Sequence, residues 1–146
     1  LISGRRSIGN LSFRFIKLVD ARLGATREVL SREGVGIWYS SKARTLMDTV
    51  YDWSRFNSLP RGFSWIKEAI GDDAEIAEEL AEVAIKYGNQ ATIRRIGYLL
   101  ETLSQPSSTI DLLRQRLTSS SSFIPWIPGN PARGTVNRAW GVIVNE

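Results

Sequence analysis

Alternating apolar and polar residues near the start of the chain predict β-strands. Over Leu11–Val19 (LSFRFIKLV), most apolar side chains fall on one face and the polar ones on the other. Val35–Tyr39 (VGIWY) combines β-branched and aromatic residues, which favour strands. Thr26–Leu30, between turns at Gly24 and Gly34, is a candidate for a third, shorter strand. We therefore expect the N-terminal quarter to be largely β-structure.

After these strands the apolar residues recur every three to four positions, which is typical of amphipathic helices. Ser40 and Ser41 offer an N-cap for the first helix, and Asn89 offers one for the fourth. The acidic face of the third helix is predicted to be solvated. The expected helices run over residues 42–55, 63–70, 73–87, 90–103 and 108–117.

The last quarter of the chain is poor in helix formers. Thr118–Ser122 (TSSSS) is predicted to be a flexible link. Phe123–Pro131 (FIPWIPGNP) is expected to lie extended over the surface, with Trp126 packing down. Arg138–Asn145 (RAWGVIVN) is predicted to be a strand that returns to pair with the 11–19 or the 35–39 strand.

These elements predict an α+β fold in a single domain, residues 1–146. We expect a small mixed β-sheet, built from the N-terminal strands plus the C-terminal strand. About four to five helices would pack against one side of it, because an amphipathic helix needs a surface against which to bury its apolar stripe.

Composition argues against an enzyme. The chain has no Cys and no His, which removes thiolate chemistry, imidazole bases and most zinc sites. It also has no phosphate-binding Gly-rich loop and no nucleophile-elbow motif. We expect no catalytic residue, cofactor or metal. The absence of a signal-peptide pattern and of an apolar run near 20 residues leads us to expect a cytoplasmic protein with no membrane contact.

Charge is spread unevenly along the chain. Residues 1–70 hold 12 of the 19 Lys and Arg but only 6 of the 15 Asp and Glu, so this half carries +6 and the rest −2. A solvated Arg-rich surface explains this, and so does a module that binds RNA or DNA. The candidate contact residues in this half are Arg5, Arg6, Arg14, Lys17, Arg22 and Arg27.

The helix within Tyr87–Glu101 (YGNQATIRRIGYLLE) has one apolar face and one face with two arginines. Arg94, Arg95 and Tyr98 are candidates for an anion or partner contact. The alternative is an ordinary surface, with Arg94 near Glu101 and an arginine stacked on Tyr98. Gly97 within this helix predicts the close approach of another backbone, since Gly is otherwise unfavourable there.

The carboxylates of Asp48 and Asp52 lie one turn apart on the first helix and could suggest metal or acid–base chemistry. Arg44 and Arg55 stand at ion-pair spacing from them. Because arginine competes for carboxylate oxygens, we predict two structural ion pairs.

Three motifs in this order resemble the C-terminal domain of AbiEi-type antitoxins, from bacterial type IV toxin–antitoxin (abortive infection) systems. Lys42–Tyr51 resembles the family's R-T-L-x-D helix, through Arg44, Thr45, Leu46 and Asp48. Arg94–Glu101 resembles its R-R-L/I-G-Y-L-L-E helix. Trp140–Asn145 resembles its closing W-G-V-x-V-N strand.

The resemblance implies a non-enzymatic antitoxin that counters a nucleotidyltransferase-like toxin without a stable complex. It also implies an N-terminal winged helix-turn-helix that binds operator DNA and represses the operon. This chain contains no such domain, so we expect it upstream. A nucleic-acid-binding module acting through the basic N-terminal half is the alternative, and a dimerisation scaffold is a third.

Overall fold

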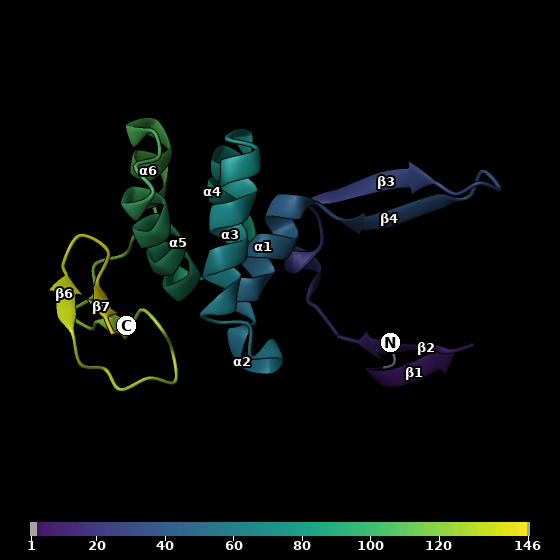
Figure 1. Cartoon of the computed structure of the whole chain (residues 1–146), viewed down its shortest axis with the longest axis horizontal. Helices are drawn as coiled ribbons and strands as arrows, with labels where there is room; N and C mark the ends of the chain where they lie inside the picture. The colour runs from purple at the N-terminus through teal and green to yellow at the C-terminus, as the bar shows by residue number, and fades with distance from the viewer. Residues whose placement is uncertain (1–2, 146) are drawn as a thin grey trace.

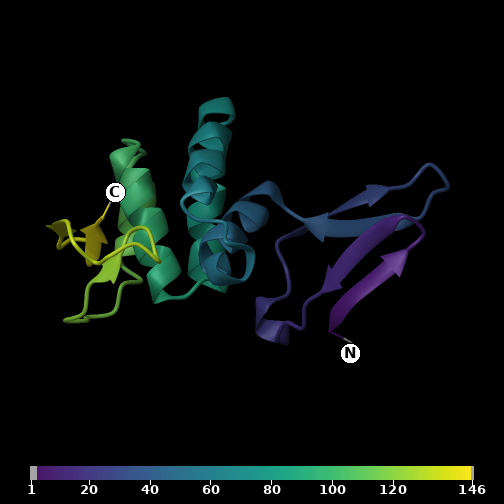
Figure 2. The same cartoon turned by 60° about the horizontal axis from the view of Figure 1, so that its bottom comes forward.

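The computed structural model describes residues 3–145. Two β-hairpins lie at one end of the molecule, a small C-terminal sheet lies at the other, and helices fill the space between them (Figures 1 and 2). The strands are β1 (Gly4–Ile8), β2 (Leu11–Phe15), β3 (Thr26–Leu30), β4 (Gly36–Ser40), β5 (Ile124–Pro125), β6 (Thr135–Asn137) and β7 (Val142–Val144). The helices are η1 (Asp20–Arg22), α1 (Lys42–Tyr51), α2 (Trp53–Phe56), α3 (Arg61–Asp72), α4 (Glu75–Tyr87), α5 (Gln90–Thr102) and α6 (Ser107–Arg114).

Both predicted helix caps are confirmed. The Ser41 hydroxyl accepts a hydrogen bond from the Arg44 backbone N–H (3.1 Å), and the Asn89 side chain accepts one from that of Thr92 (2.9 Å). Each bond satisfies an N–H group that has no partner within its own helix. The predicted helix over residues 42–55 is divided at Asp52 into α1 and α2.

The core lies among the helices. Helices α1, α4 and α5 contact one another, and only Gly88 and Asn89 separate α4 from α5 along the chain. In the described chain, every buried apolar side chain falls between Ala43 and Val142, so the first forty residues supply none. The largest fully buried side chains include Trp140, Met47 and Ile66.

The C-terminal strand confirms the α+β class but corrects the predicted pairing. β7 lies between β5, with which it is parallel, and β6, with which it is antiparallel. It contacts α5 and does not pair with an N-terminal strand. Pairing of β7 with β6 closes a loop of a few residues, and pairing with β5 closes one of about twenty. The predicted pairing with an N-terminal strand would close a loop of over a hundred residues. Chain entropy favours the shorter closure.

The N-terminal strands pair within two hairpins instead of joining one sheet. β1, which the sequence pattern did not reveal, pairs with β2, and β3 pairs with β4. Gly9 opens the two-residue β1–β2 turn with φ of 59°, a conformation that glycine adopts at no steric cost. The predicted 11–19 strand ends at Phe15.

Within residues 3–145, the structure contains neither a helix long and apolar enough to cross a membrane nor a cluster of three metal-ligating side chains.

Candidate interaction surface

The β1–β2 hairpin carries two arginines directly opposite each other. Arg5 pairs in register with Arg14, and Ser7 pairs with Ser12 two positions along. Because side chains alternate between the two faces of a strand, these four lie on one face. Like charges at directly opposed positions are unfavourable. An anion placed between the two guanidinium groups would relieve that repulsion.

The opposite face of the same hairpin is apolar and exposed. Ile8 pairs with Leu11, and Arg6 pairs with Phe13, so Arg6 lies on this face and apart from Arg5 and Arg14. Lys17 is exposed just beyond the end of β2. The hairpin is therefore amphipathic, and the structure brings together two of the candidate basic residues rather than all of them.

The β3–β4 hairpin is also exposed over all its residues. Trp38 pairs with Glu28 and is 65% exposed. Arg27 pairs with Tyr39 across the strands, and its guanidinium lies 3.3 Å from the carboxylate of Glu79 on α4. Arg27 therefore links this hairpin to the helices.

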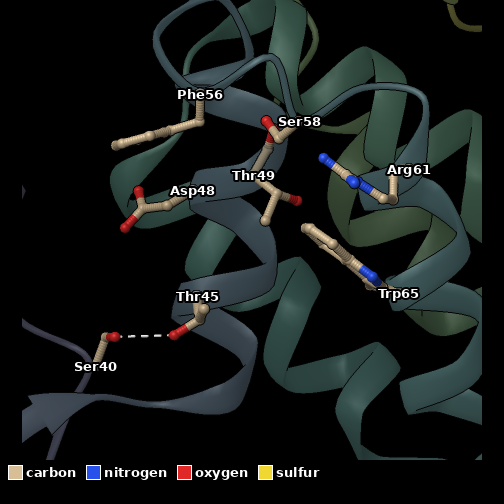
Figure 3. A pocket seen from close by; sticks show the side chains of 8 residues that line it. All are labelled: Ser40, Thr45, Asp48, Thr49, Phe56, Ser58, Arg61 and Trp65. Carbon is tan, nitrogen blue, oxygen red and sulfur yellow. Dashed lines mark hydrogen bonds between the residues drawn. The ribbon is translucent and has the colours of Figure 1, made fainter.

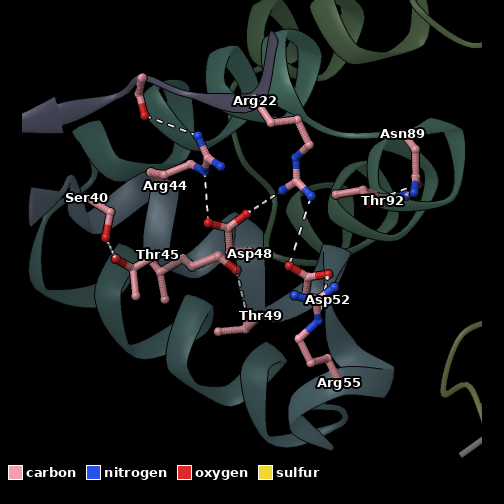
Figure 4. A network of polar contacts seen from close by, with 12 residues as sticks. Arg22, Ser40, Arg44, Thr45, Asp48, Thr49, Asp52, Arg55, Asn89 and Thr92 are labelled. Atoms are coloured by element: carbon pink, nitrogen blue, oxygen red, sulfur yellow. Dashed lines mark hydrogen bonds and ion pairs between the residues drawn. The ribbon is translucent and has the colours of Figure 1, made fainter. Parts of the chain in front are cut away.

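A network of arginines and carboxylates joins the segment before β3 to α1 (Figure 4). Asp48 accepts hydrogen bonds from Arg44 Nε (2.9 Å) and from Arg22 Nη2 (2.8 Å). Arg44 also donates to the Gly24 carbonyl, at 3.1 Å. The Arg22 guanidinium stacks over the Tyr51 ring, 3.5 Å from its centroid. Arg22, a candidate contact residue, is thus already engaged within the protein.

The same network confirms the predicted ion pairs. Arg44–Asp48 is close, at 2.9 Å, and Arg55–Asp52 is looser, at 3.9 Å. Asp52 also lies 4.0 Å from a guanidinium nitrogen of Arg22. With arginines against both carboxylates, this site holds the chain together and lacks free ligands for a cation.

A pocket of about 300 Å³ opens beside this network, between the end of β4 and helices α1 and α3 (Figure 3). The Ser40 and Thr45 hydroxyls lie 2.8 Å apart on one wall. On another, Arg61 stands over the exposed Trp65 ring, 5.4 Å from its centroid. Neither Arg61 nor Trp65 was among the predicted candidates, although their i,i+4 spacing on a helix was a usable signal.

Arg94 and Arg95 are buried, which corrects their predicted place on an exposed face. They are 7% and 5% exposed. Arg94 Nη1 donates to the Ser122 carbonyl at 3.0 Å, and Arg95 donates twice to the Pro125 carbonyl, at 3.3 and 3.1 Å. Burial lowers the pKa of the Arg95 guanidinium to about 10, since desolvation disfavours its charged form. The C-terminal segment covers this face of α5, which helical spacing alone could not show.

The neighbours of these arginines also differ from the expectation. Glu101 forms its ion pair with Arg114, not with Arg94. Tyr98 is half-buried, and its ring meets that of Trp126 edge-on, with centroids 4.8 Å apart. Trp126 is buried, as predicted, and stacks on Phe63 at 3.9 Å.

Gly97 accommodates an indole ring rather than a backbone. A Cβ at this position would lie 2.1 Å from the Trp140 ring, closer than any real contact allows. The Trp140 indole N–H donates to the Glu101 carboxylate at 2.8 Å. The close approach was predicted correctly, but its partner is a side chain from the C-terminal segment.

Comparisons with protein-family models, with curated proteins and with solved structures find no match to this chain.

Proposed function

We propose that this chain is the C-terminal, non-enzymatic domain of an AbiEi-type antitoxin. In this proposal it acts in the cytoplasm, counters a nucleotidyltransferase-like toxin, and forms part of a repressor whose winged helix-turn-helix lies upstream. The observation that carries the proposal is the meeting in space of three motifs that are far apart in the sequence. Trp140 of the third motif packs on Gly97 and bonds Glu101 of the second, while helices α1 and α5, which carry the first and second, are in contact.

The motif residues support the proposal as determinants of one folded unit. Arg44, Arg95 and Trp140 are buried and make polar contacts within the chain. All four strands of the two hairpins, by contrast, are exposed along their whole length. We therefore expect antitoxin activity to depend on exposed hairpin residues, and Arg44, Arg95 and Trp140 to matter through folding.

Co-expression with the nucleotidyltransferase-like toxin encoded beside it tests this proposal. The chain, joined to its upstream segment, is expected to restore growth to cells that express the toxin. The double variant Arg5→Ala/Arg14→Ala tests whether this rescue depends on the β1–β2 hairpin. The control is Arg116→Ala/Arg133→Ala, which removes the same charge from exposed positions elsewhere. Absence of rescue by the unmodified protein, at a level where it is folded and soluble, would refute the antitoxin proposal.

Nucleic-acid binding is the second candidate, and one specific observation favours it. Arg5 and Arg14 face each other on an exposed, two-stranded ribbon, with Ser7 and Ser12 beside them. Guanidinium groups suit phosphate oxygens, and a two-stranded ribbon is narrow enough to enter a major groove of DNA. The two functions are compatible, because an antitoxin could shield an RNA from its toxin.

Fluorescence anisotropy with duplex DNA and structured RNA tests this second candidate over a range of salt concentrations. Binding should weaken steeply with salt, since it releases counterions. Arg5→Glu/Arg14→Glu should flatten the logarithmic salt slope by about 1.4 to 1.8, which corresponds to two lost phosphate contacts. Arg116→Glu/Arg133→Glu is the charge-matched control. Equal losses in both double variants would mean that only net charge matters and that the ribbon is not the site.

A further inference from the structure

A second cavity, of about 260 Å³, is lined by residues of α5, of the Ser-rich link after α6 and of the β6–β7 turn. The C-terminal sheet, to which this turn belongs, lies at the end of the molecule opposite the hairpins (Figure 1). Arg94 contributes the α5 wall, Thr118–Ser120 the link, and Arg138 and Gly141 the turn.

Arg94 is a buried cation with no anionic partner in the part of the chain that is described. Its side chain is 7% exposed, and none of the ion pairs within residues 3–145 includes it. One of its five N–H groups donates to the Ser122 carbonyl. A buried charge is costly unless an opposite charge compensates it. The guanidinium is therefore suited to receive an anion from outside.

The cavity supplies further groups that an anion needs. Arg138 is exposed at the rim and adds a second guanidinium. Thr118, Ser119 and Ser120 add hydroxyl donors, and the Ser120 hydroxyl lies 2.8 Å from that of Ser122. These groups match the donors that bind phosphate oxygens in proteins, where arginine is preferred for its planar, forked geometry.

Gly141, in the turn between β6 and β7, lies against the Arg94 guanidinium. Its φ is +65°, and a Cβ built there would lie 3.4 Å from the Arg94 guanidinium. That distance is an ordinary van der Waals contact, but any other residue would be strained in this backbone conformation. The turn between β6 and β7 thus passes close to Arg94 while leaving it at the cavity wall.

We propose that this cavity binds the terminal phosphate of a phosphomonoester, with Arg94 and Arg138 as the two cations. Its volume falls just below the range of about 300–1,000 Å³ usual for drug-sized ligands, so it suits one phosphate group and a small part of the attached molecule. The ligand is either a free small phosphomonoester or the 5′-phosphate of a nucleic-acid strand. This site is remote from the hairpins and does not depend on the proposed antitoxin function.

Titration of the full chain by NMR and calorimetry tests the proposal. The probes are inorganic phosphate, adenosine 5′-monophosphate, and one oligonucleotide with a 5′-phosphate or a 5′-hydroxyl. We expect saturable binding, with amide shifts centred on Ser119, Ser120 and Gly141. If the 5′-phosphorylated strand binds more tightly than the same strand with a 5′-hydroxyl, the ligand is the end of a nucleic-acid strand. Binding of phosphate or the nucleotide without that preference identifies a free phosphomonoester.

Two surface arginines of the same segment give a matched pair of variants. Arg138→Gln removes the rim cation and should weaken binding about tenfold, the effect of losing one charge-assisted contact. Arg133→Gln, which lies outside the cavity, should bind as the unmodified protein does. Arg94→Gln should abolish binding, with its folding checked by circular dichroism.

Three results would overturn the proposal. The first is the absence of saturable binding by any probe. The second is equal affinity of the Arg138→Gln and Arg133→Gln variants. The third is a set of amide shifts centred on the hairpins, which would assign the bound anion to Arg5 and Arg14 instead.

Discussion

Trp140 connects the end of the chain to the middle of α5 through a single side chain. Its ring fills the space left by the missing side chain of Gly97, and its indole N–H reaches the carboxylate of Glu101. Glu101 also pairs with Arg114 on α6. Trp140 thus links the C-terminal segment to α5 directly and, through Glu101, to α6.

Gly97→Ala should destabilise the fold, although alanine is the better helix former. The gain in helix propensity is about 1 kcal/mol, whereas overpacking costs about 1–3 kcal/mol and the alanine Cβ would meet the Trp140 ring. Gly71→Ala, in α3 with no atom within 4 Å of its added Cβ, is the matched control and should be neutral or stabilising. Urea unfolding measures both, and equal gains in stability would contradict the packing described here.

Trp140→Phe should remove the hydrogen bond to Glu101 and leave most of the ring contact. Bonds to a charged group are worth about 1.5–3 kcal/mol, so we expect a loss of that order in the free energy of unfolding. Trp65→Phe, at an exposed position, should change it by less than about 0.5 kcal/mol. Glu101→Ala removes the acceptor, so if it fails to reduce the effect of Trp140→Phe in a double-mutant cycle, the two groups are not coupled.

At the scale of elements, the junction around Asp48 determines how the first two dozen residues are held. Arg22 and Arg44 both bond this carboxylate, and Arg44 in turn holds the Gly24 carbonyl. These polar contacts compensate for the lack of buried apolar side chains in the hairpins.

Asp48→Asn should loosen the segment before β3 while the helices stay folded. The amide cannot balance two guanidinium groups, and we expect a loss of about 1.5–3 kcal/mol. Proteolysis within residues 16–25 should become faster, and hydrogen exchange in α4 and α5 should change least. Asp111→Asn, which breaks an exposed i,i+3 pair with Arg114, is the control and should cost less than about 1 kcal/mol. Similar proteolysis of the two variants would argue against the junction.

For the whole molecule, the buried apolar core belongs to residues 43–142. A fragment that begins at Ser41, which preserves the α1 cap, should therefore fold and unfold cooperatively. Its stability should be lower, because Arg22 and Gly24 no longer contact α1. Circular dichroism in urea measures this, with deletion of residues 123–145 as the contrasting variant that should abolish cooperative unfolding, since it removes Trp126 and Trp140. A fragment from Ser41 with no cooperative transition would show that the hairpins are needed for folding.

Several predictions that depended on neighbouring residues agree with the structure, although the 42–55 helix is divided and the 11–19 strand is shorter than predicted. The caps at Ser41 and Asn89, the Arg44–Asp48 pair and the strand over Thr26–Leu30 each follow from interactions within a few residues. The α+β class followed from the same periodicities. At the candidate site, the opposition of Arg5 and Arg14 was not predicted, because β1 lacks a clear alternation of apolar residues.

What the sequence determined by itself is the approximate position of the main helices, the caps at Ser41 and Asn89, and the existence of a C-terminal strand. Tertiary structure alone decided which strand β7 pairs with, and that Arg94 and Arg95 lie beneath the 122–125 segment rather than in water. The physical reason is the separation along the sequence of the residues that interact. Helix periodicity and capping depend on residues three or four apart, whereas the burial of an arginine on α5 depends on a segment about thirty residues away.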